Sequence, residues 1–567
     1  MSSLKYWEKR QAQRMFEYMQ SAEDTADEVS KLYQKASGYI SYELDRIFER
    51  YKRKHHLTDA EAYRLLNTLG DKTSLDGLKQ ALKVPGRGQT AADLLAELES
   101  PAYQARLERL QQLQNQIDLT MQEIYNQEKV RNTSHYVDLA NEAYYKSIFD
   151  IQQRTGMGFS FSLIDPKVIE TVINSKWSGE NYSKRIWNNT QALAKDLKQE
   201  LLVSLVTGRT DRETADIIAN KHAQGASNAR RLVRTESCNL ANQMEMLSYE
   251  ECGIETYIYV ATLDLKTSEE CRRLDGKRFP VAEQQPGKNC PPMHPWCRST
   301  TICDISAEEL AQMKRRARDP ETGKTITVPA NMTYDEWYRK NVKGRAQAEY
   351  KETAVKNHST DRKQYERYKA VLGDDIPKSL DSFQKIKYTD KKKWGTLKYE
   401  YRIVNQYDMV LGSVPPQKIV ELHEKNQQFR NEFKSGVGKK GNAAALEFNR
   451  KTYYANSSIQ STASRGYSKY KGNPADLILL KPKTERAFKT FPVKSSSSPY
   501  GSWDRCIDSE AKLMEFLHDS NDGRISEAYL LSDFPMCDSC KNVLEQFKQH
   551  DSNIHLNVVE RKKHGST

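Results

Sequence analysis

The nine cysteines of this chain fall into two groups that lie far apart in the sequence. Six lie between Cys238 and Cys303, and three lie between Cys506 and Cys540. Histidine or aspartate stands near each group, which favours metal sites in a reducing compartment over a framework of disulfides. A chain of 567 residues is expected to divide into about three or four domains, and the two groups fall in different ones.

The C-terminal group carries the spacing that points most directly to chemistry. Asp508 precedes Glu510 by two residues, and Cys537-x-x-Cys540 follows. One carboxylate and two thiolates would supply three zinc ligands and leave a fourth position for water, as in catalytic zinc sites. Glu510 would then move protons without binding the metal. Asp508 could instead be only the N-cap of a helix, with Glu510 in its first turn.

The central group predicts a second metal site of a different kind. Cys290, His294 and Cys297 lie within eight residues, and Cys271 is placed to complete a tetrahedral set with them. Four protein ligands would leave no open position, so this site would be structural. Packed thiols without a metal are an equally good interpretation of the same residues.

The pattern of apolar residues predicts a multidomain chain that is mainly α-helical in its N-terminal and central regions. Residues 1–130 form a helical region in which Leu107, Leu110, Leu113 and Ile117 recur at helical spacing. Residues 131–345 continue it, with a strand-like run at 256–264. Residues 346–397 are expected to be a charged helical linker.

Residues 398–567 alternate candidate strands with helices, which predicts a three-layer α/β domain. The candidate strands are 399–405, 443–449, 451–458, 475–480, 527–533 and 553–560, and the helices are 417–433, 508–517 and 538–549.

Two polar stretches invite interpretations that the sequence does not favour. Gly323-Lys324-Thr325 resembles the end of a phosphate-binding loop, but Arg318 stands where the first glycine is required and no strand is expected before it. The basic and aromatic stretch 391–402 could be a nucleic-acid surface, although a solvated linker is the preferred interpretation.

The net charge and the lengths of the apolar runs bear on what the protein binds and on whether it enters a membrane. The net charge of +12 is compatible with a polyanionic partner, nucleic acid included. No apolar run approaches the roughly 18 residues that cross a bilayer, and the first residues lack a signal-peptide pattern. Membrane insertion and classical secretion are therefore not expected.

The central region resembles a known family, the Mu F-type minor capsid proteins of phage head morphogenesis. The resemblance spans about 130–345 and rests on Arg234-Thr235-Glu236, Asp264, the stretch 271–279 and the "PGKNCPPMHPWCRSTT" element at 286–301. It implies an α+β minor head domain, a virion location, and portal and capsid proteins as partners. Cys290 stands where many relatives have a small residue.

The C-terminal region resembles the toxin-type deaminases of bacterial polymorphic toxins. The resemblance spans about 400–560 and rests on the segments 441–448, 453–458, 488–493 and 508–517. Asp508 replaces the usual histidine ligand, Met536 separates Pro535 from Cys537, and Asn456 replaces another expected histidine.

The deaminase resemblance implies a reaction and further site residues. The reaction would be zinc-dependent hydrolytic deamination of a base, cytosine to uracil in DNA or RNA, in the cytoplasm of the bacterial host. Asn442 and Ser457 would contact the base, and an immunity protein could protect the producing cell. Two alternatives remain: a purely structural head-assembly protein with an inert zinc-binding tail, and an interbacterial toxin on a phage-derived scaffold.

Overall fold

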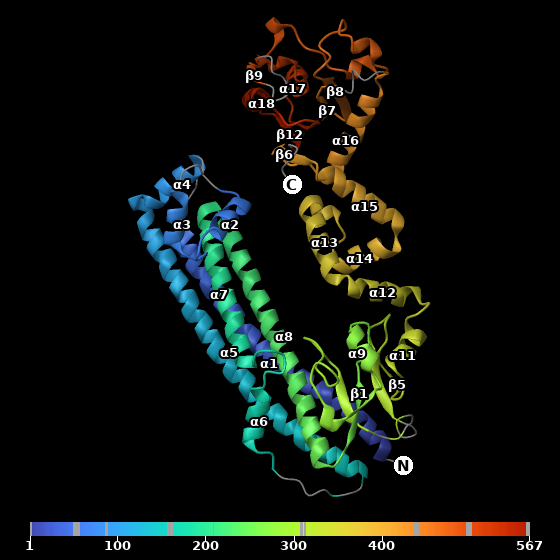
Figure 1. Ribbon diagram of the computed structural model, residues 1–567. Helices are drawn as coiled ribbons and strands as arrows, with labels where there is room; N and C mark the ends of the chain where they lie inside the picture. The colour runs from blue at the N-terminus through green and yellow to red at the C-terminus, as the bar shows by residue number, and fades with distance from the viewer. Residues whose placement is uncertain are drawn as a thin grey trace. The chain divides into compact units, whose positions relative to one another are not determined.

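The protein divides into two compact units, Met1–Glu349 and Tyr350–Thr567. The computed structural model shown in Figure 1 describes residues 3–48, 57–84, 89–155, 158, 163–207, 209–304, 306, 310, 313–434, 441–494 and 502–562. Each unit has its own buried core, and each is described by itself below.

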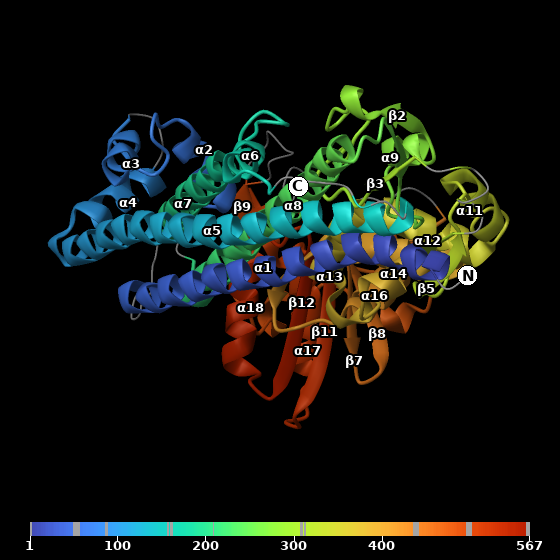
Figure 2. The ribbon, with the colours of Figure 1, turned by 90° about the horizontal axis from the view of Figure 1, so that it is seen from below.

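Four long helices form the first unit's main body and run side by side in Figures 1 and 2. They are α1 (Ser3–Phe48), α5 (Pro101–Thr155), α7 (Tyr182–Thr207) and α8 (Asp211–Glu251). The stripe predicted at Leu107, Leu110, Leu113 and Ile117 is buried in their shared core, because residues three and four apart share one helix face. The boundary predicted between residues 130 and 131 falls inside α5.

Short helices complete this helical part of the first unit. They are α2 (Asp59–Asn67), α3 (Leu75–Leu82), α4 (Gln89–Glu99) and α6 (Pro166–Ile173). Thr58 caps α2 with the reciprocal bond from Glu61, and Thr210 caps α8 in the same way with Glu213. These capping boxes satisfy amide groups that have no partner within the helix.

A small β-region follows α8. The strand predicted near residue 256 is β1 (Thr256–Val260), which pairs antiparallel with β2 (Arg278–Pro280) and β3 (Thr300–Cys303). Helix α9 (Glu269–Leu274) lies between β1 and β2, and α11 (Tyr334–Asn341) follows the strands. The central cysteine group lies on and around this sheet.

The polar stretch around Gly323 forms a hairpin, which was not predicted from the sequence. Strand β4 (Lys314–Arg318) pairs antiparallel with β5 (Thr325–Pro329), so the expectation that no strand precedes Gly323 was wrong. Gly323 has a positive φ of 71° in the connecting turn, a conformation that favours glycine. The segment is therefore a hairpin and not a phosphate-binding loop.

The predicted charged linker is a packed layer of helices. It comprises α12 (Ala346–Lys356), α13 (His358–Leu372), α14 (Leu380–Thr389) and α15 (Lys391–Val404). Phe383 is fully buried, and the rings of Tyr368 and Tyr401 stack at 4.0 Å. The helices were predicted correctly, but their solvation was not, since their aromatic side chains share a core with the following sheet. The candidate strand 399–405 is the end of α15.

A five-stranded mixed sheet forms the centre of the second unit, in the order β6-β12-β11-β7-β8. The strands are β6 (Tyr407–Leu411), β7 (Ala443–Phe448), β8 (Lys451–Asn456), β11 (Ser526–Ser532) and β12 (Ile554–Arg561). Only β11 and β12 run parallel among these pairs. Four of the six candidate strands are confirmed, β6 was missed, and 475–480 contains a short 3-10 turn instead.

Alternation along the strands places helices on both faces of this sheet. Leu446, Leu530 and Val558 pack against α17 (Ser509–Asp519) and α18 (Asp538–His550). Their neighbours Leu531 and Val559 pack toward α16 (Pro416–Asn431). Successive side chains of a strand point to opposite faces, so the second unit has helix, sheet and helix layers. A two-stranded ribbon of β9 (Pro492–Lys494) and β10 (Ser502–Asp504) precedes α17.

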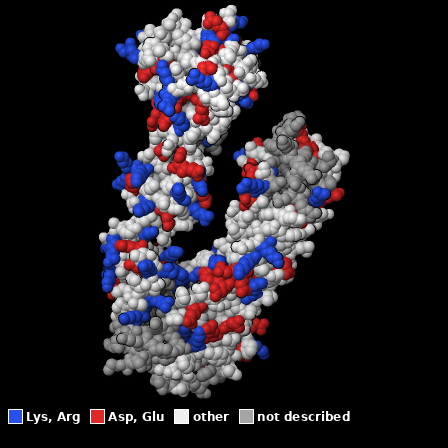
Figure 3. All heavy atoms as spheres, turned by 180° about the vertical axis from the view of Figure 1, so that it is seen from behind, with Lys and Arg blue, Asp and Glu red and all other residues white. Residues whose placement is uncertain are grey.

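The protein surface carries charges of both signs. On the face drawn in Figure 3, lysine and arginine side chains are interspersed with aspartate and glutamate. The excess of positive charge is therefore not gathered into a single patch on that face. Within the described residues, every helix is too short or too polar to cross a bilayer.

Candidate active site

Two helix N-termini bring the predicted C-terminal ligands together. Asp508 stands at the N-cap position of α17, and Cys537 stands at the N-cap position of α18. The Cys537 sulfur accepts a hydrogen bond from the Cys540 backbone amide at 3.4 Å, which fixes both sulfurs at the first turn of α18. The positive end of a helix dipole favours thiolates at this place.

The Asp508 carboxylate turns toward the sulfurs and away from the helix that it precedes. Its Oδ2 atom lies 3.3 Å from Cys537 Sγ and 3.4 Å from Cys540 Sγ. Although Asp508 has the backbone conformation of an N-cap, its side chain makes no capping bond within the described structure. The simple capping interpretation therefore does not account for this side chain. Ligand atoms of all three residues lie within 4.8 Å of one another, which is the arrangement that could hold a metal ion.

The two sulfurs differ in acidity. A hydrogen bond between the thiols is the largest effect on both: it lowers the pKa of Cys537 and raises the pKa of Cys540. Burial adds to the rise at Cys540. Without a metal, Cys537 is therefore the more easily ionised of the pair. A bound cation would favour the thiolate form of both.

Glu510 is buried beside this group and held by three side chains. Its Oε1 accepts hydrogen bonds from Asn442 Nδ2 at 2.8 Å and from Ser532 Oγ at 2.7 Å. Its Oε2 accepts one from Ser509 Oγ at 3.1 Å. The side chain is 2% exposed, and burial, followed by the nearby Asp508 charge, raises the pKa of Glu510 to about 7.

Of the two predicted base contacts, Asn442 bonds to Glu510, and Ser457 bonds to Asn442. The Asn442 backbone amide donates to Ser457 Oγ at 2.8 Å, and the Ser457 amide donates to the Asn442 carbonyl at 2.8 Å. Asn442 Oδ1 is buried, and no described group hydrogen-bonds to it. That oxygen is thus a buried acceptor without a donor among the described groups.

Two side chains of this region were not foreseen from the sequence. Ser532 ends β11 and contacts both Glu510 and Asn442. Lys512 is 2% exposed and donates to the carbonyls of Asn456 at 2.8 Å and Ile459 at 2.7 Å, so it ties α17 to the loop after β8. Burial lowers the pKa of Lys512 to about 7. A lysine between apolar neighbours in 511–513 was the available signal.

The central group is brought together only in part. Cys271 Sγ lies 3.4 Å from His294 Nε2 and 3.8 Å from Cys297 Sγ, and these three residues form a possible metal-binding group. Cys290 lies outside it; its sulfur contacts its neighbour's carbonyl, at Pro291, at 3.6 Å. Cys290 is therefore not part of this group in the structure, and the smaller set of Cys271, His294 and Cys297 is the one that the fold assembles.

Cys238 occupies the place beside Cys297 that Cys290 was expected to take. A hydrogen bond with Cys238 is the largest cause that raises the pKa of Cys297 to about 11. Cys238 lies on α8, well before Cys271 and Cys297 in the sequence, so spacing gave no indication of the contact.

The fold and the two sites thus describe a chain with an α+β unit that carries a Cys-His-Cys group and an α/β unit that carries an Asp-Cys-Cys group. Comparison with known families agrees with this division. Residues 189–302 match the family described as Phage Mu protein F like protein, and residues 426–562 match Toxin-deaminase, the BURPS668_1122 family of deaminases. These matches support the fusion of a phage head domain with a C-terminal deaminase domain.

One curated relative has a different activity in its name. It is the NAD(+)--arginine ADP-ribosyltransferase EFV of Enterococcus faecalis (strain ATCC 700802 / V583), which is 25% identical over 286 residues. The match covers 48% of this chain and 55% of the relative, so the chain spans about half of that protein's length. No solved structure matches this chain. A deaminase-family domain and this relative both suggest an enzyme.

Proposed function

We propose that the second unit is a zinc-dependent nucleobase deaminase that converts cytosine to uracil in DNA or RNA. The observation that carries the proposal is the Asp508 carboxylate, which lies against two thiols while Glu510 is held in a buried position beside them. A helix cap and two unrelated cysteines would not require this arrangement. The match of residues 426–562 to a deaminase family supports the same reaction class.

The donor set fits zinc. Two thiolates and a carboxylate are common zinc ligands, and three protein ligands are the number that catalytic zinc sites use. Asp508, Cys537 and Cys540 would hold the ion. When bound, zinc would supply the positive charge that makes a water acidic enough to attack at neutral pH.

Glu510 has the surroundings of a proton carrier. In the reaction, water adds to C4 of the base, a C–O bond forms, the C–N bond breaks and ammonia leaves. Glu510 takes a proton from the attacking water and delivers it to ring N3. It then takes the proton of the new hydroxyl on C4 and passes it to the departing amine, which leaves a carbonyl at C4. The bonds from Asn442 and Ser532 hold Oε1, whereas Oε2 accepts the single, longer bond from Ser509 at 3.1 Å; Oε2 is therefore the oxygen that we assign to proton transfer.

Asn442 and Ser457 orient the base. The buried Asn442 Oδ1 can accept a hydrogen bond from an exocyclic amine, which cytosine has and uracil lacks. Ser457 holds the backbone of Asn442 in place through two bonds. Single-stranded substrate is the easier target, because a base in a duplex must first be flipped out.

The first unit would place this enzyme in a phage particle. We propose that it acts as a minor head component with portal and capsid proteins as partners, and that the deaminase travels in the virion and acts in the bacterial cytoplasm. The match of residues 189–302 to the Mu F-like family supports this role. Cys271, His294 and Cys297 would hold a zinc ion there, and Cys238, which hydrogen-bonds to Cys297, is the neighbouring thiol that would complete a structural set of four. An immunity protein would protect a producing cell.

The test measures zinc and uracil formation by the full-length chain on single- and double-stranded DNA and RNA. We expect about one zinc ion bound by Asp508, Cys537 and Cys540, and uracil in at least one substrate. Glu510→Gln should keep that zinc and lose about 10²- to 10⁴-fold in rate. Glu545→Gln, on the exposed side of α18, is the matched control and should keep full activity.

Two results would contradict the proposal. Equal activity of the wild type and Glu510→Gln would remove the role of Glu510. A zinc-loaded wild type that leaves cytosine unchanged in every substrate would favour the inert, structural alternative.

A further inference from the structure

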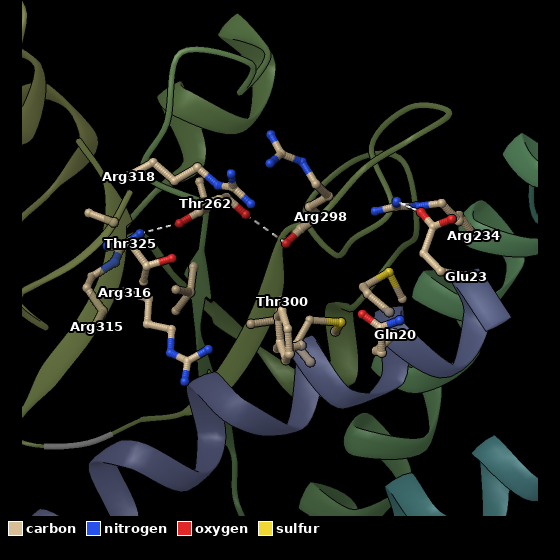
Figure 4. Close-up of a pocket in the computed structure, with 16 residues that line it drawn as sticks. Gln20, Glu23, Arg234, Thr262, Arg298, Thr300, Arg315, Arg316, Arg318 and Thr325 are labelled. Carbon is tan, nitrogen blue, oxygen red and sulfur yellow. Dashed lines mark hydrogen bonds and ion pairs between the residues drawn. The ribbon is translucent and has the colours of Figure 1, made fainter. Parts of the chain in front are cut away.

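A cavity of about 340 Å³ lies in the first unit, whereas the proposed deaminase site lies in the second unit. Figure 4 shows side chains from α1, α8, the β4–β5 hairpin and the segment before β3 around it. Five of its lining side chains are arginines: Arg234, Arg298, Arg315, Arg316 and Arg318. Among the described lining residues, Glu23 alone carries a carboxylate.

Three of these arginines already have carboxylate partners. Arg234 pairs with Glu23, Arg298 with Asp264 and Arg315 with Asp275. Arg298 and Arg315 each bind their aspartate through two nitrogens, which fixes the guanidinium planes. These three ion pairs lie at the wall of the cavity, and their carboxylates neutralise three of the five arginine charges.

Arg316 and Arg318 differ from these three arginines in their exposure and in their ion pairing. Both are exposed, both lie on β4, and in the described part of the chain neither forms an ion pair with a carboxylate. Residues two apart on a strand point to the same face, so the two guanidinium groups approach the cavity from one side. They give this side of the cavity two positive charges without a counter-charge.

An aromatic ring stands next to one of them. The Arg316 guanidinium carbon lies 5.4 Å from the centre of the Phe16 ring, within the range of a cation–π contact. Phe16 is 55% exposed, although it belongs to a helix whose other apolar side chains at Met15 and Met19 are buried. An exposed ring beside a guanidinium is a surface on which a planar base can stack.

We propose that this cavity binds the phosphate of a nucleotide, either free or within a single-stranded nucleic acid. Arg316 and Arg318 contact the phosphate oxygens, and Phe16 stacks on the base. The terminal phosphate of a free nucleotide carries nearly two negative charges, and two successive phosphodiesters of a single strand carry one each, so either source matches the two guanidinium groups. The cavity volume lies at the lower end of the range of about 300–1,000 Å³ for small-ligand sites, which suits one nucleotide unit.

The experiment measures binding of two probes to the full-length chain. ADP represents the free nucleotide, and a single-stranded oligothymidylate represents the nucleic acid and has no amine to be deaminated. The test variant is Arg316→Gln with Arg318→Gln. The control is Lys314→Gln with Lys324→Gln, which removes two positive charges from the same hairpin outside the cavity.

We expect at least one probe to bind, and the probe that binds tighter identifies the source of the phosphate. The test variant should weaken that binding about tenfold or more, because two charge-assisted contacts are lost. The control should leave the affinity unchanged. If the oligothymidylate binds, the slope of log affinity against log salt concentration should be smaller in magnitude by about 1.4 for the test variant than for the wild type. Each of the two lost phosphate contacts contributes about 0.7 to this difference. Phe16→Ala should weaken the binding of ADP more than the binding of pyrophosphate, which has no base to stack on the ring.

Three results would overturn the proposal. The first is that neither probe binds at low salt. The second is equal affinity of wild type and test variant. The third is a polyglutamate peptide that binds as tightly as the nucleotide probes and shows the same loss in the test variant, which would make an acidic peptide the occupant.

Discussion

Asn442 Nδ2 donates to Glu510 Oε1 across 2.8 Å and so joins the entry of β7 to the first turn of α17. The same amide nitrogen donates to Ser532 Oγ at 2.8 Å. The orientation of the amide is thereby set, and its buried oxygen has no hydrogen-bond donor among the described groups. One side chain therefore both positions the proposed proton carrier and offers an atom to the base.

Asn442→Ala should lower the rate of deamination by about 10- to 100-fold while zinc stays bound at Asp508, Cys537 and Cys540. The reason is that Glu510 loses one of its two partners at Oε1 and the base loses its acceptor. Uracil release and zinc content of the same sample provide the measurement. Asn542→Ala, an exposed asparagine on α18, is the control. Full activity of Asn442→Ala would show that this amide has no role.

Asp508→Ala should abolish zinc binding at the C-terminal site and cost the metal-free protein little stability. Loss of a true N-cap costs about 1 kcal/mol, but the Asp508 side chain makes no capping bond among the described groups. Metal analysis and thermal unfolding after chelation separate the two roles. A drop of about 1 kcal/mol without loss of zinc would restore the capping interpretation.

Gly225→Ala should destabilise the first unit, whereas Gly38→Ala should stabilise it. A Cβ at Gly225 would meet Leu193 Cδ2 at 2.8 Å and Tyr33 Cε1 at 2.9 Å, where α8 packs against α7 and α1. We expect a net loss of about 1–2 kcal/mol, since overpacking outweighs the gain in helix propensity. Gly38 has open space around its Cα, so alanine there should gain about 0.5–1 kcal/mol. Chemical unfolding measures the free energy of unfolding, which should be lower than in the wild type for Gly225→Ala and higher for Gly38→Ala.

Glu128 should contribute a loss of stability to the first unit as the pH rises from about 4.5 to about 7. Burial raises the pKa of Glu128 from 4.5 to about 7, so the folded state holds this proton more tightly than the unfolded state does. The stabilisation is complete below pH 4.5 and is lost through the folded pKa, by up to about 3 kcal/mol. Burial also raises the pKa of Glu245 to about 7, which adds a slope of the same sign, whereas burial lowers the pKa of His135 to about 4, which adds a slope of the opposite sign.

Glu128→Gln should reduce this pH slope without removing it. The side-chain oxygen of glutamine can still accept the bond that Tyr33 donates at 2.9 Å, but it cannot ionise. Thermal unfolding midpoints at several pH values would measure the difference. An unchanged slope would contradict the assignment to Glu128.

Cys271→Ala should lower zinc bound to the central group, whereas Cys290→Ala should not. Cys271 contacts both His294 and Cys297, while Cys290 lies outside this group. Metal analysis should be done in the Asp508→Ala background, so that only the central site contributes. Equal loss of zinc in both variants would return Cys290 to the ligand set, and absence of zinc in their parent would favour packed thiols.

Local sequence patterns predicted much of the secondary structure. The heptad-like stripe from Leu107 to Ile117 is buried, and β7, β8, β11, β12 and the three C-terminal helices lie where alternation or helical periodicity placed them. The strand interpretation failed at 399–405, because "YEYRIVN" also presents Ile403 and Val404 to a helical core. The segment is a helix because Ile403 and Val404 share a core with the aromatic cluster around Tyr368 and Phe383. These partners lie too far away in the sequence to affect a pattern read over a few neighbouring residues.

The sequence by itself determined which residues could serve as ligands and proton carriers, because donor chemistry and spacing along a helix are local properties. It named Asp508, Glu510, Cys537, Cys540 and Asn442, and the fold brings all five together. Only the tertiary structure decided that Asp508 faces the thiols and not its helix, that Cys290 stands apart, and that Ser532 and Lys512 belong to the site. Those outcomes depend on how separate strands and helices pack, and no spacing within one segment encodes that arrangement.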